Sequence, residues 1–187
     1  MLRWLRRQAQ QWRSHLLTLL IALAAMLAVQ AWQTRDVGTG ALAPELLTQP
    51  VTLLWQGQAQ TTTLAEALAR VRGDDELPVG LYVWADWCPV CRTMRGMADG
   101  FAQDHPMLSI AMRSGPNTQV QSYLQEHALN WPTLVDPSGA LARALGFGAV
   151  PAFATVSAND ELATPTVGLT SSWGMRLRWW WARFNPS

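Results

Sequence analysis

Two cysteines are the residues of this sequence best suited to carry out a reaction. They are Cys88 and Cys91, separated by Pro89 and Val90, and the chain has no other cysteine. A pair this close is redox-active, part of a metal site, or two unconnected thiols. A structural zinc site normally takes four protein ligands, and the three histidines are dispersed without a zinc-finger spacing. We therefore favour a redox-active pair and expect neither a metal site nor a cofactor.

The sequence on either side of the pair predicts a junction between a strand and a helix. Residues 81–84 form a continuous apolar run, which is typical of a strand buried on both faces. Residues 90–101 have the pattern of a helix, and Pro89 suits its first position, where the missing N–H costs nothing. Reactive sites in α/β sheets commonly lie at such carboxyl ends of strands.

This junction suits thiol–disulfide exchange, which needs a thiolate nucleophile and a second thiol that resolves the mixed disulfide. Cysteines three residues apart at a helix start lie on one face and are close enough to bond. Unpaired N–H groups and a partial positive charge at the helix N-terminus stabilise a thiolate there. We predict that Cys88 is exposed and attacks the substrate, and that Cys91 is more buried and resolves the mixed disulfide.

The order of the other elements predicts an α/β domain with a mixed sheet. We expect the remaining strands at 51–56, 107–112, 133–135, 152–156 and 164–168. We expect the remaining helices at 63–71, 118–128, 140–145 and from 171 or 172 to 184. Thr63 and Glu66 form a capping-box pattern at the first of these helices. The arginines beside Trp179, Trp180 and Trp181 in the last helix suit a membrane-surface helix. We favour the alternative, in which these tryptophans pack in the core and the arginines face outward.

The composition limits the function classes. Of the 187 residues, 49% are hydrophobic and 14% are charged, which excludes wholesale disorder. The formal net charge is only +1, so there is no overall basic surface for nucleic acid, and we expect none as a partner.

The N-terminal segment indicates a membrane anchor. Residues 1–15 carry four arginines and no acid, and residues 16–32 are almost wholly apolar. That stretch is near the minimum length for a bilayer span, and the basic flank places the N-terminus in the cytoplasm. A cleaved signal peptide is the alternative. Either way, we expect the rest of the chain outside the cytosol, which in a bacterium with an outer membrane is the periplasm.

We therefore expect four parts in the chain. They are a cytoplasmic basic segment at 1–15, a single inner-membrane span at 16–32, a linker at 33–50 and one catalytic domain at 51–187.

Two motifs resemble those of thioredoxin-like proteins. Residues 84–91 read W-A-D-W-C-P-V-C, similar to the W-A-x-W-C-x-x-C signature, and residues 148–152 read G-A-V-P-A, similar to a later G-x-x-P segment. The resemblance implies a thioredoxin fold in which Pro151 follows a cis peptide bond and faces the cysteines. It also implies that Val150 offers backbone hydrogen bonds to a protein substrate. We expect Trp87, Pro89 and Val90 to complete the substrate-binding surface.

Further segments are similar to a narrower branch of that family. Residues 120–147 resemble the extra helix–strand insert of the membrane-tethered, TlpA-like proteins. Residues 111–115 and 168–181 and the N-terminal anchor are similar to the D proteins of the bacterial suppressor-of-copper-sensitivity set. This resemblance implies a dithiol–disulfide oxidoreductase that acts on protein disulfides, is kept reduced by a membrane electron-transfer partner and is linked to copper tolerance.

One position departs from the family. Thioredoxin has a buried aspartate six residues before its first cysteine, and here that place holds Tyr82. Tyrosine is a poor base near neutral pH, so we expect proton handling to differ, through water or Asp86. The direction of electron flow therefore stays open.

A copper-binding module is the competing hypothesis. Two thiolates are soft ligands that suit Cu(I), and Met94 and Met97 follow them. Those methionines have helical spacing, however, and are more typical of a core. A reductase with one dedicated client, as in cytochrome c maturation, differs in substrate and not in chemistry, and the sequence does not decide between it and a general exchanger.

Overall fold

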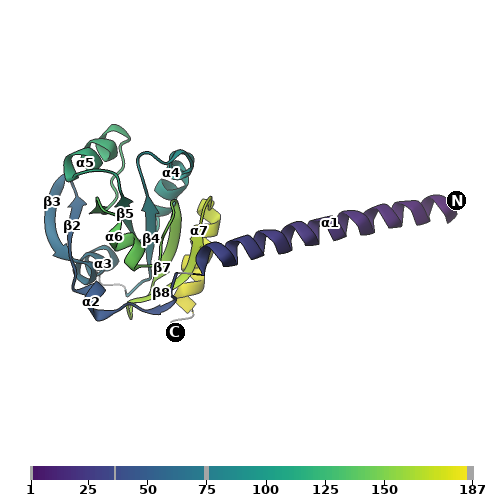
Figure 1. Ribbon diagram of the computed structural model, residues 1–187, viewed down its shortest axis with the longest axis horizontal. Helices are drawn as coiled ribbons and strands as arrows, with labels where there is room; N and C mark the ends of the chain where they lie inside the picture. Colours follow the sequence, from purple (N-terminus) through teal and green to yellow (C-terminus); the bar gives the residue numbers. More distant parts are fainter. Residues whose placement is uncertain (1, 36, 74–75, 185–187) are drawn as a thin grey trace. The chain divides into compact units, whose positions relative to one another are not determined.

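A computed structural model of the chain, shown in Figure 1, describes residues 2–35, 37–73 and 76–184. The chain divides into two compact units, Met1–Arg35 and Asp36–Ser187. The first unit is one long helix, α1 (Leu2–Thr34). The second unit is an α/β domain built on a single eight-stranded sheet.

Helix α1 contains the predicted membrane segment. The window His15–Trp32 is long and apolar enough to cross a membrane, and among the described residues it is the only such window. The described side chains of this window are nearly all exposed. An apolar surface of this size is expected where lipid, and not water, covers the helix. The side chains of Arg3, Arg6, Arg7 and Arg13, from which the sequence predicts the orientation, lie outside the described residues.

The elements of the domain follow one another along the chain. The strands are β1 (Gly40–Ala41), β2 (Pro50–Trp55), β3 (Gln58–Thr63), β4 (Val79–Trp84), β5 (Met107–Met112), β6 (Thr133–Asp136), β7 (Ala152–Val156) and β8 (Glu161–Val167). The helices are α2 (Pro44–Leu47), α3 (Leu64–Arg72), α4 (Pro89–Ala102), α5 (Asn117–Glu126), α6 (Ala140–Ala144) and α7 (Ser172–Phe184).

The sheet is mixed, as predicted. Its strand order is β1-β8-β7-β4-β5-β6-β2-β3. Strand β4 is parallel to β5 and β5 is parallel to β6, whereas the other neighbours are antiparallel. Strand β6, which lies in the predicted insert, pairs with both β5 and β2.

Helices cover both faces of the sheet (Figure 1), and β4 shows why the sequence requires this. Every residue of β4 is buried. Leu81 and Val83 join a core cluster with residues of α3 and α6, and Tyr82 and Trp84 join a second cluster with residues of α4, α5 and α7. Because side chains alternate along a strand, an all-apolar strand must be covered on both sides.

The predicted linker at 33–50 is wrong. Helix α1 continues to Thr34, β1 pairs with β8 at the edge of the sheet, and α2 follows. Val37 is buried in the core, and Leu46 and Leu47 pack against it. Glycine and proline in this segment suggested a linker, but Val37, Leu46 and Leu47 attach it to the domain core.

Candidate active site

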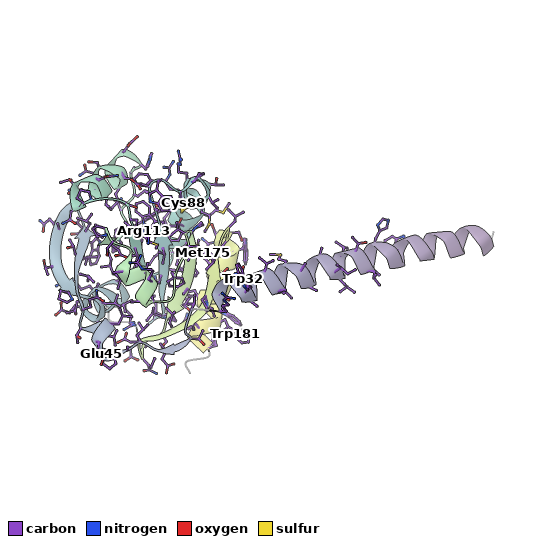
Figure 2. The ribbon with its side chains drawn as sticks, viewed as in Figure 1. Trp32, Glu45, Cys88, Arg113, Met175 and Trp181 are labelled. Atoms are coloured by element: carbon purple, nitrogen blue, oxygen red, sulfur yellow. A yellow bond between two sulfur atoms is a disulfide. The ribbon has the colours of Figure 1, made fainter. Side chains whose placement is uncertain are left out.

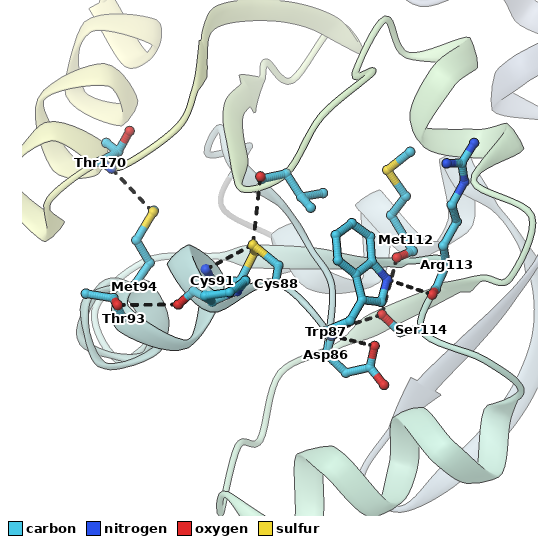
Figure 3. Close-up of a disulfide and its surroundings, with 12 residues drawn as sticks. Asp86, Trp87, Cys88, Cys91, Thr93, Met94, Met112, Arg113, Ser114 and Thr170 are labelled. Atoms are coloured by element: carbon cyan, nitrogen blue, oxygen red, sulfur yellow. Dashed lines mark hydrogen bonds between the residues drawn. A yellow bond between two sulfur atoms is a disulfide. The ribbon is translucent and has the colours of Figure 1, made fainter.

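The two cysteines lie at the N-terminus of α4, as the sequence predicts, and Figure 2 labels Cys88 there. Cys88 is the N-cap residue, and Pro89 occupies the first turn. The backbone N–H of Cys91 donates a hydrogen bond to Sγ of Cys88 over 3.1 Å (Figure 3). The two residues form a disulfide, with their Cα atoms 5.2 Å apart. A helix N-terminus therefore directs a donor and its partial positive charge at this sulfur.

The segment before β7 faces the pair. Strand β7 is antiparallel to β4, with Ala152 opposite Val83, so the residues before β7 lie beside the end of β4. The Val150–Pro151 peptide bond is cis, the geometry that the resemblance implies. The carbonyl oxygen of Val150 lies 3.8 Å from Sγ of Cys88 (Figure 3). Pro151 is buried and Val150 is partly buried.

The expected difference in exposure between the cysteines is not found. Cys88 is 4% exposed and Cys91 is 3% exposed. Both belong to the core cluster of Trp84 and Met94, against which Val150 also packs. The prediction treated the start of the helix as a protruding tip, but the segment at Val150 covers Cys88. In the disulfide form, burial alone therefore does not distinguish the nucleophile from the resolving thiol.

At the surface, exposed apolar side chains surround the buried cysteine pair. Trp87 is 55% exposed, Val90 is 42% exposed, and Pro89 is exposed. The indole Nε1 of Trp87 donates to the carbonyl oxygen of Arg113 over 3.0 Å (Figure 3). A large aromatic side chain is therefore held next to Cys88 while much of it stays exposed, an arrangement typical of recognition surfaces.

A polar network that supports Trp87 is not predictable from local sequence patterns. Asp86 accepts hydrogen bonds from the backbone N–H of Trp87 over 2.8 Å and from the amide of Gln119 over 2.7 Å. The backbone N–H of Asp86 donates to the hydroxyl of Ser114 over 3.1 Å. The one signal available was topological, because Ser114 follows β5, the parallel neighbour of β4, and carboxyl ends of parallel strands meet at one edge.

Tyr82 occupies the place of the thioredoxin aspartate and has a different chemistry. Its side chain is 1% exposed and meets the ring of Trp131 edge to face at 5.8 Å between centroids. Burial, with a smaller contribution from Tyr123, raises the pKa of Tyr82 above its ordinary value, which is itself well above neutrality. Tyr82 therefore stays neutral at physiological pH and does not act as a base for Cys91.

Comparison with known proteins places this site in a family. The sequence model described as Redoxin matches residues 61–169, which include the cysteines and Pro151. The chain belongs to the Redoxin family. A "Thioredoxin-like protein" of Haemophilus influenzae is 31% identical over 112 residues, which cover 59% of this chain and 66% of that relative, slightly less than two thirds of its length.

Solved structures share the thioredoxin-like fold at low identity. DsbF from MTB, solved in mixed oxidised and reduced forms, has a TM-score of 0.58 and 20% identity over 73% of this chain and 96% of its own. StoA from Bacillus subtilis has a TM-score of 0.54 and 16% identity over 72% and 98%. A secreted thiol-disulfide isomerase from Corynebacterium glutamicum has a TM-score of 0.54 and 17% identity over 64% and 74%. This likeness confirms the predicted fold class.

Proposed function

We propose that this Redoxin-family protein is a protein thiol–disulfide oxidoreductase, anchored in the inner membrane, whose domain works in the periplasm. The observation that carries the proposal is the hydrogen bond from the N–H of Cys91 to Sγ of Cys88 at the start of α4. It supplies a donor to the sulfur that becomes a thiolate when the disulfide is reduced. The neighbouring Cys91 supplies the second sulfur that exchange requires.

The reduced protein exchanges thiols with a substrate disulfide in two steps. The Cys88 thiolate attacks one substrate sulfur, so the substrate S–S bond breaks, a mixed disulfide forms and the other substrate sulfur leaves as a thiolate. Cys91, after losing its proton to solvent, then attacks Sγ of Cys88 and releases the second substrate sulfur. Two electrons pass to the substrate, and the protein is left with the Cys88–Cys91 disulfide.

A protein substrate is proposed because the surroundings of the pair suit an extended chain. The backbone of Val150 lies beside Cys88, so a bound strand has a carbonyl oxygen available next to the sulfur it exchanges with. Pro151, Trp87, Pro89 and Val90 supply apolar contacts around it. Backbone hydrogen bonds with apolar contacts recognise many sequences, as a general disulfide exchanger needs.

The proposal includes a membrane and an electron donor. The His15–Trp32 window supports a single span, and the arginines of residues 1–15 support a cytoplasmic N-terminus. We propose that a membrane thiol reductase returns the disulfide to the dithiol, since each turnover oxidises the protein. The likeness of residues 168–181 to the copper-sensitivity group supports a link to copper tolerance.

Trapping of mixed disulfides tests the exchange reaction. A Cys91→Ser variant of the full chain keeps the nucleophile and lacks the resolving thiol, so it accumulates mixed disulfides with periplasmic proteins. Cys88→Ser is the matched control and accumulates few. Reducible adducts are counted on gels after acid quenching and thiol blocking. Equal adduct formation by the two variants, or wild-type activity in both, would overturn the assignment.

The redox state of the pair in cells tests the electron donor. With the membrane reductase present, thiol trapping should find Cys88 and Cys91 mainly as dithiol, and without it mainly as disulfide. A pair that is fully oxidised in both backgrounds would contradict the reductant role.

A Cu(I) titration of the reduced protein distinguishes copper binding from disulfide exchange. Among the described residues no group of three or more His, Cys, Asp or Glu side chains is placed to hold a metal ion. The sulfur of Met94, which lies in the same core cluster as the cysteines, accepts a hydrogen bond from the N–H of Thr170 over 3.3 Å. Tight one-to-one Cu(I) binding by the reduced protein, without exchange of protein disulfides, would favour the copper-binding alternative.

A further inference from the structure

Helix α7 has two apolar faces, and the domain covers only one of them. Met175, Trp179 and Ala182 are buried, and α7 packs against the sheet and α4. The outer face consists of Trp173 at 78% exposed, Leu177 at 62%, Trp180 at 52%, Trp181 at 56% and Phe184 at 61%. At about 100° per residue these outer positions lie on the side of the helix opposite the buried ones.

This outer face is larger than the prediction of a packed helix allows. The sequence predicts core packing for Trp179, Trp180 and Trp181, and only Trp179 is in the core. The outer face continues into a hollow of about 570 Å³ between α7 and β8, whose floor includes Thr164 and Pro165. A contiguous apolar surface of this kind on a folded domain indicates a partner that covers it.

The charges beside the outer face are positive. Helix α7 contains Arg176, Arg178 and Arg183 and no acidic residue. Arg176 pairs with Asp104 of the neighbouring segment, whereas Arg183 lies over the rings of Trp179 and Phe184. Tryptophan with arginine is the composition that suits the boundary between phospholipid headgroups and acyl chains, where the guanidinium meets phosphate and the ring meets hydrocarbon.

The chain enters the domain at the same edge of the sheet. Strand β1 is antiparallel to β8, with Gly40 opposite Leu162, so the residues before Gly40 approach from the side of Thr164 and Pro165. Only four residues separate Trp32, the end of the candidate span, from the buried Val37. The chain length alone limits the distance between these two residues to at most about 18 Å. A bilayer is therefore the surface that the chain itself keeps within reach of this edge.

We propose that the outer face of α7 docks on the phospholipid interface of the membrane in which the chain is anchored. The docked helix lies in the interface, with Trp173, Leu177 and Trp181 among the headgroups and upper acyl chains. Helix α7 also holds α4, because Ser172 donates to the carbonyl oxygen of Met97 over 2.8 Å and Arg176 to that of Gly100 over 3.0 Å. Docking therefore orients the helix that carries the cysteines. This inference rests on the membrane attachment proposed above, not on the exchange reaction.

Site-specific labelling of the full chain tests the docking. The protein is placed in nanodiscs of phosphatidylcholine and phosphatidylglycerol at one chain per disc, with Cys88–Cys91 kept oxidised so that it does not react. Leu177→Cys and, independently, Trp173→Cys are then treated with a maleimide. Ala59→Cys is the control, because Ala59 is exposed on β3 at the opposite edge of the sheet.

Docking predicts that both test variants react at least about tenfold more slowly than the control, which corresponds to a docked state favoured by about 1.4 kcal/mol. Labelling at the control rate in an inserted chain overturns docking while leaving the anchor intact. Protection that appears only with two chains per disc assigns the face to a second copy and also overturns it. A chain that does not enter the discs overturns the anchor together with docking, whatever its exchange activity.

Discussion

Helices α3 and α4 begin with the same local geometry, but their N-cap residues have different roles. In α3 the N-cap is Thr63, whose hydroxyl accepts the N–H of Glu66 over 3.2 Å. In α4 the N-cap is Cys88, whose sulfur accepts the N–H of Cys91 over 3.1 Å. Both caps have extended backbone angles, and both donors lie three residues along the chain. The donor that stabilises a helix end at Thr63 is therefore directed at a reactive sulfur at Cys88.

The third helical position completes the parallel. In α3 the side chain of Glu66 reaches back to the backbone N–H of Thr63, which closes a capping box. In α4 the side chain of Cys91 reaches back to the side chain of Cys88 and closes a disulfide. The difference shows that the backbone geometry of the active site is an ordinary helix start. The residue types at the N-cap and the third helical position, and the segment at Val150 that faces them, make it reactive.

The largest expected effect separates the two roles of Cys88, as the N-cap of α4 and as the nucleophile. Cys88→Ser should lower the rate of protein disulfide exchange by at least about 10³-fold, some 4 kcal/mol in activation free energy, because a hydroxyl is a far weaker nucleophile than a thiolate. Serine is a good N-cap, so the reduced variant should unfold within about 0.5 kcal/mol of reduced wild type. Insulin reduction and thermal unfolding followed by near-ultraviolet circular dichroism measure the two quantities.

Cys88→Ala is the control for that pair of measurements. It should be equally inactive, and loss of the capping atom should cost about 1 kcal/mol of stability in addition. Exchange by Cys88→Ser within about tenfold of wild type would show that the sulfur of Cys88 is not the nucleophile.

The next effect concerns the residue just before the reactive cap. Trp87→Ala should lower kcat/KM for a protein disulfide by about tenfold, because a largely exposed ring that contacts the substrate contributes about 1.4 kcal/mol. The rate with a small disulfide such as oxidised glutathione should stay unchanged. Trp173→Ala, which removes another exposed tryptophan, is the matched control and should affect neither rate. An equal loss with both disulfides would assign Trp87 to the cysteines themselves and not to substrate recognition.

At Thr63, the N-cap of α3, a substitution should change stability and leave exchange activity unchanged. Thr63→Ala should cost about 1 kcal/mol of unfolding free energy through the lost bond to Glu66, while disulfide exchange stays at the wild-type rate. Thr63→Ser keeps the hydroxyl and should restore most of the stability. A large loss of exchange activity in Thr63→Ala with normal folding would mean that α3 influences the site, and the comparison would fail.

Much of this arrangement is predictable because local signals act over a few residues. The pattern around Thr63 and Glu66 predicts the capping box, and the apolar run before the cysteines predicts a strand entering a helix. The structure has both features. The cis bond before Pro151, by contrast, follows from resemblance to a family, since spacing alone does not indicate which proline is cis.

What the sequence does not predict depends on contacts between distant segments. Strand β3 is polar and has four exposed residues at its start, so it lacks the alternation that identifies a strand. Its pairing with β2 alone makes it a strand. In the same way, the burial of Cys88 depends on Val150, which is 62 positions away. The exposure of Trp180 and Trp181 depends on how many of the helix's faces the sheet can cover.

The smallest effect lies in the pH dependence of the α3 cap. A hydrogen bond from the hydroxyl of Thr62, then one from the N–H of Thr63, lower the pKa of Glu66 below its ordinary value of 4.5. A carboxyl whose pKa is lower in the folded state stabilises the fold above its unfolded value, and this contribution is lost as the pH falls through the folded value. Wild type should therefore lose more stability than Glu66→Gln when Tm is measured from about pH 7 to about pH 3. A Tm difference between the two that is constant over that range would show that the charge of Glu66 adds nothing to the capping box. The cysteine cap of α4, which has no carboxylate at its third position, gives no such acid-dependent contribution.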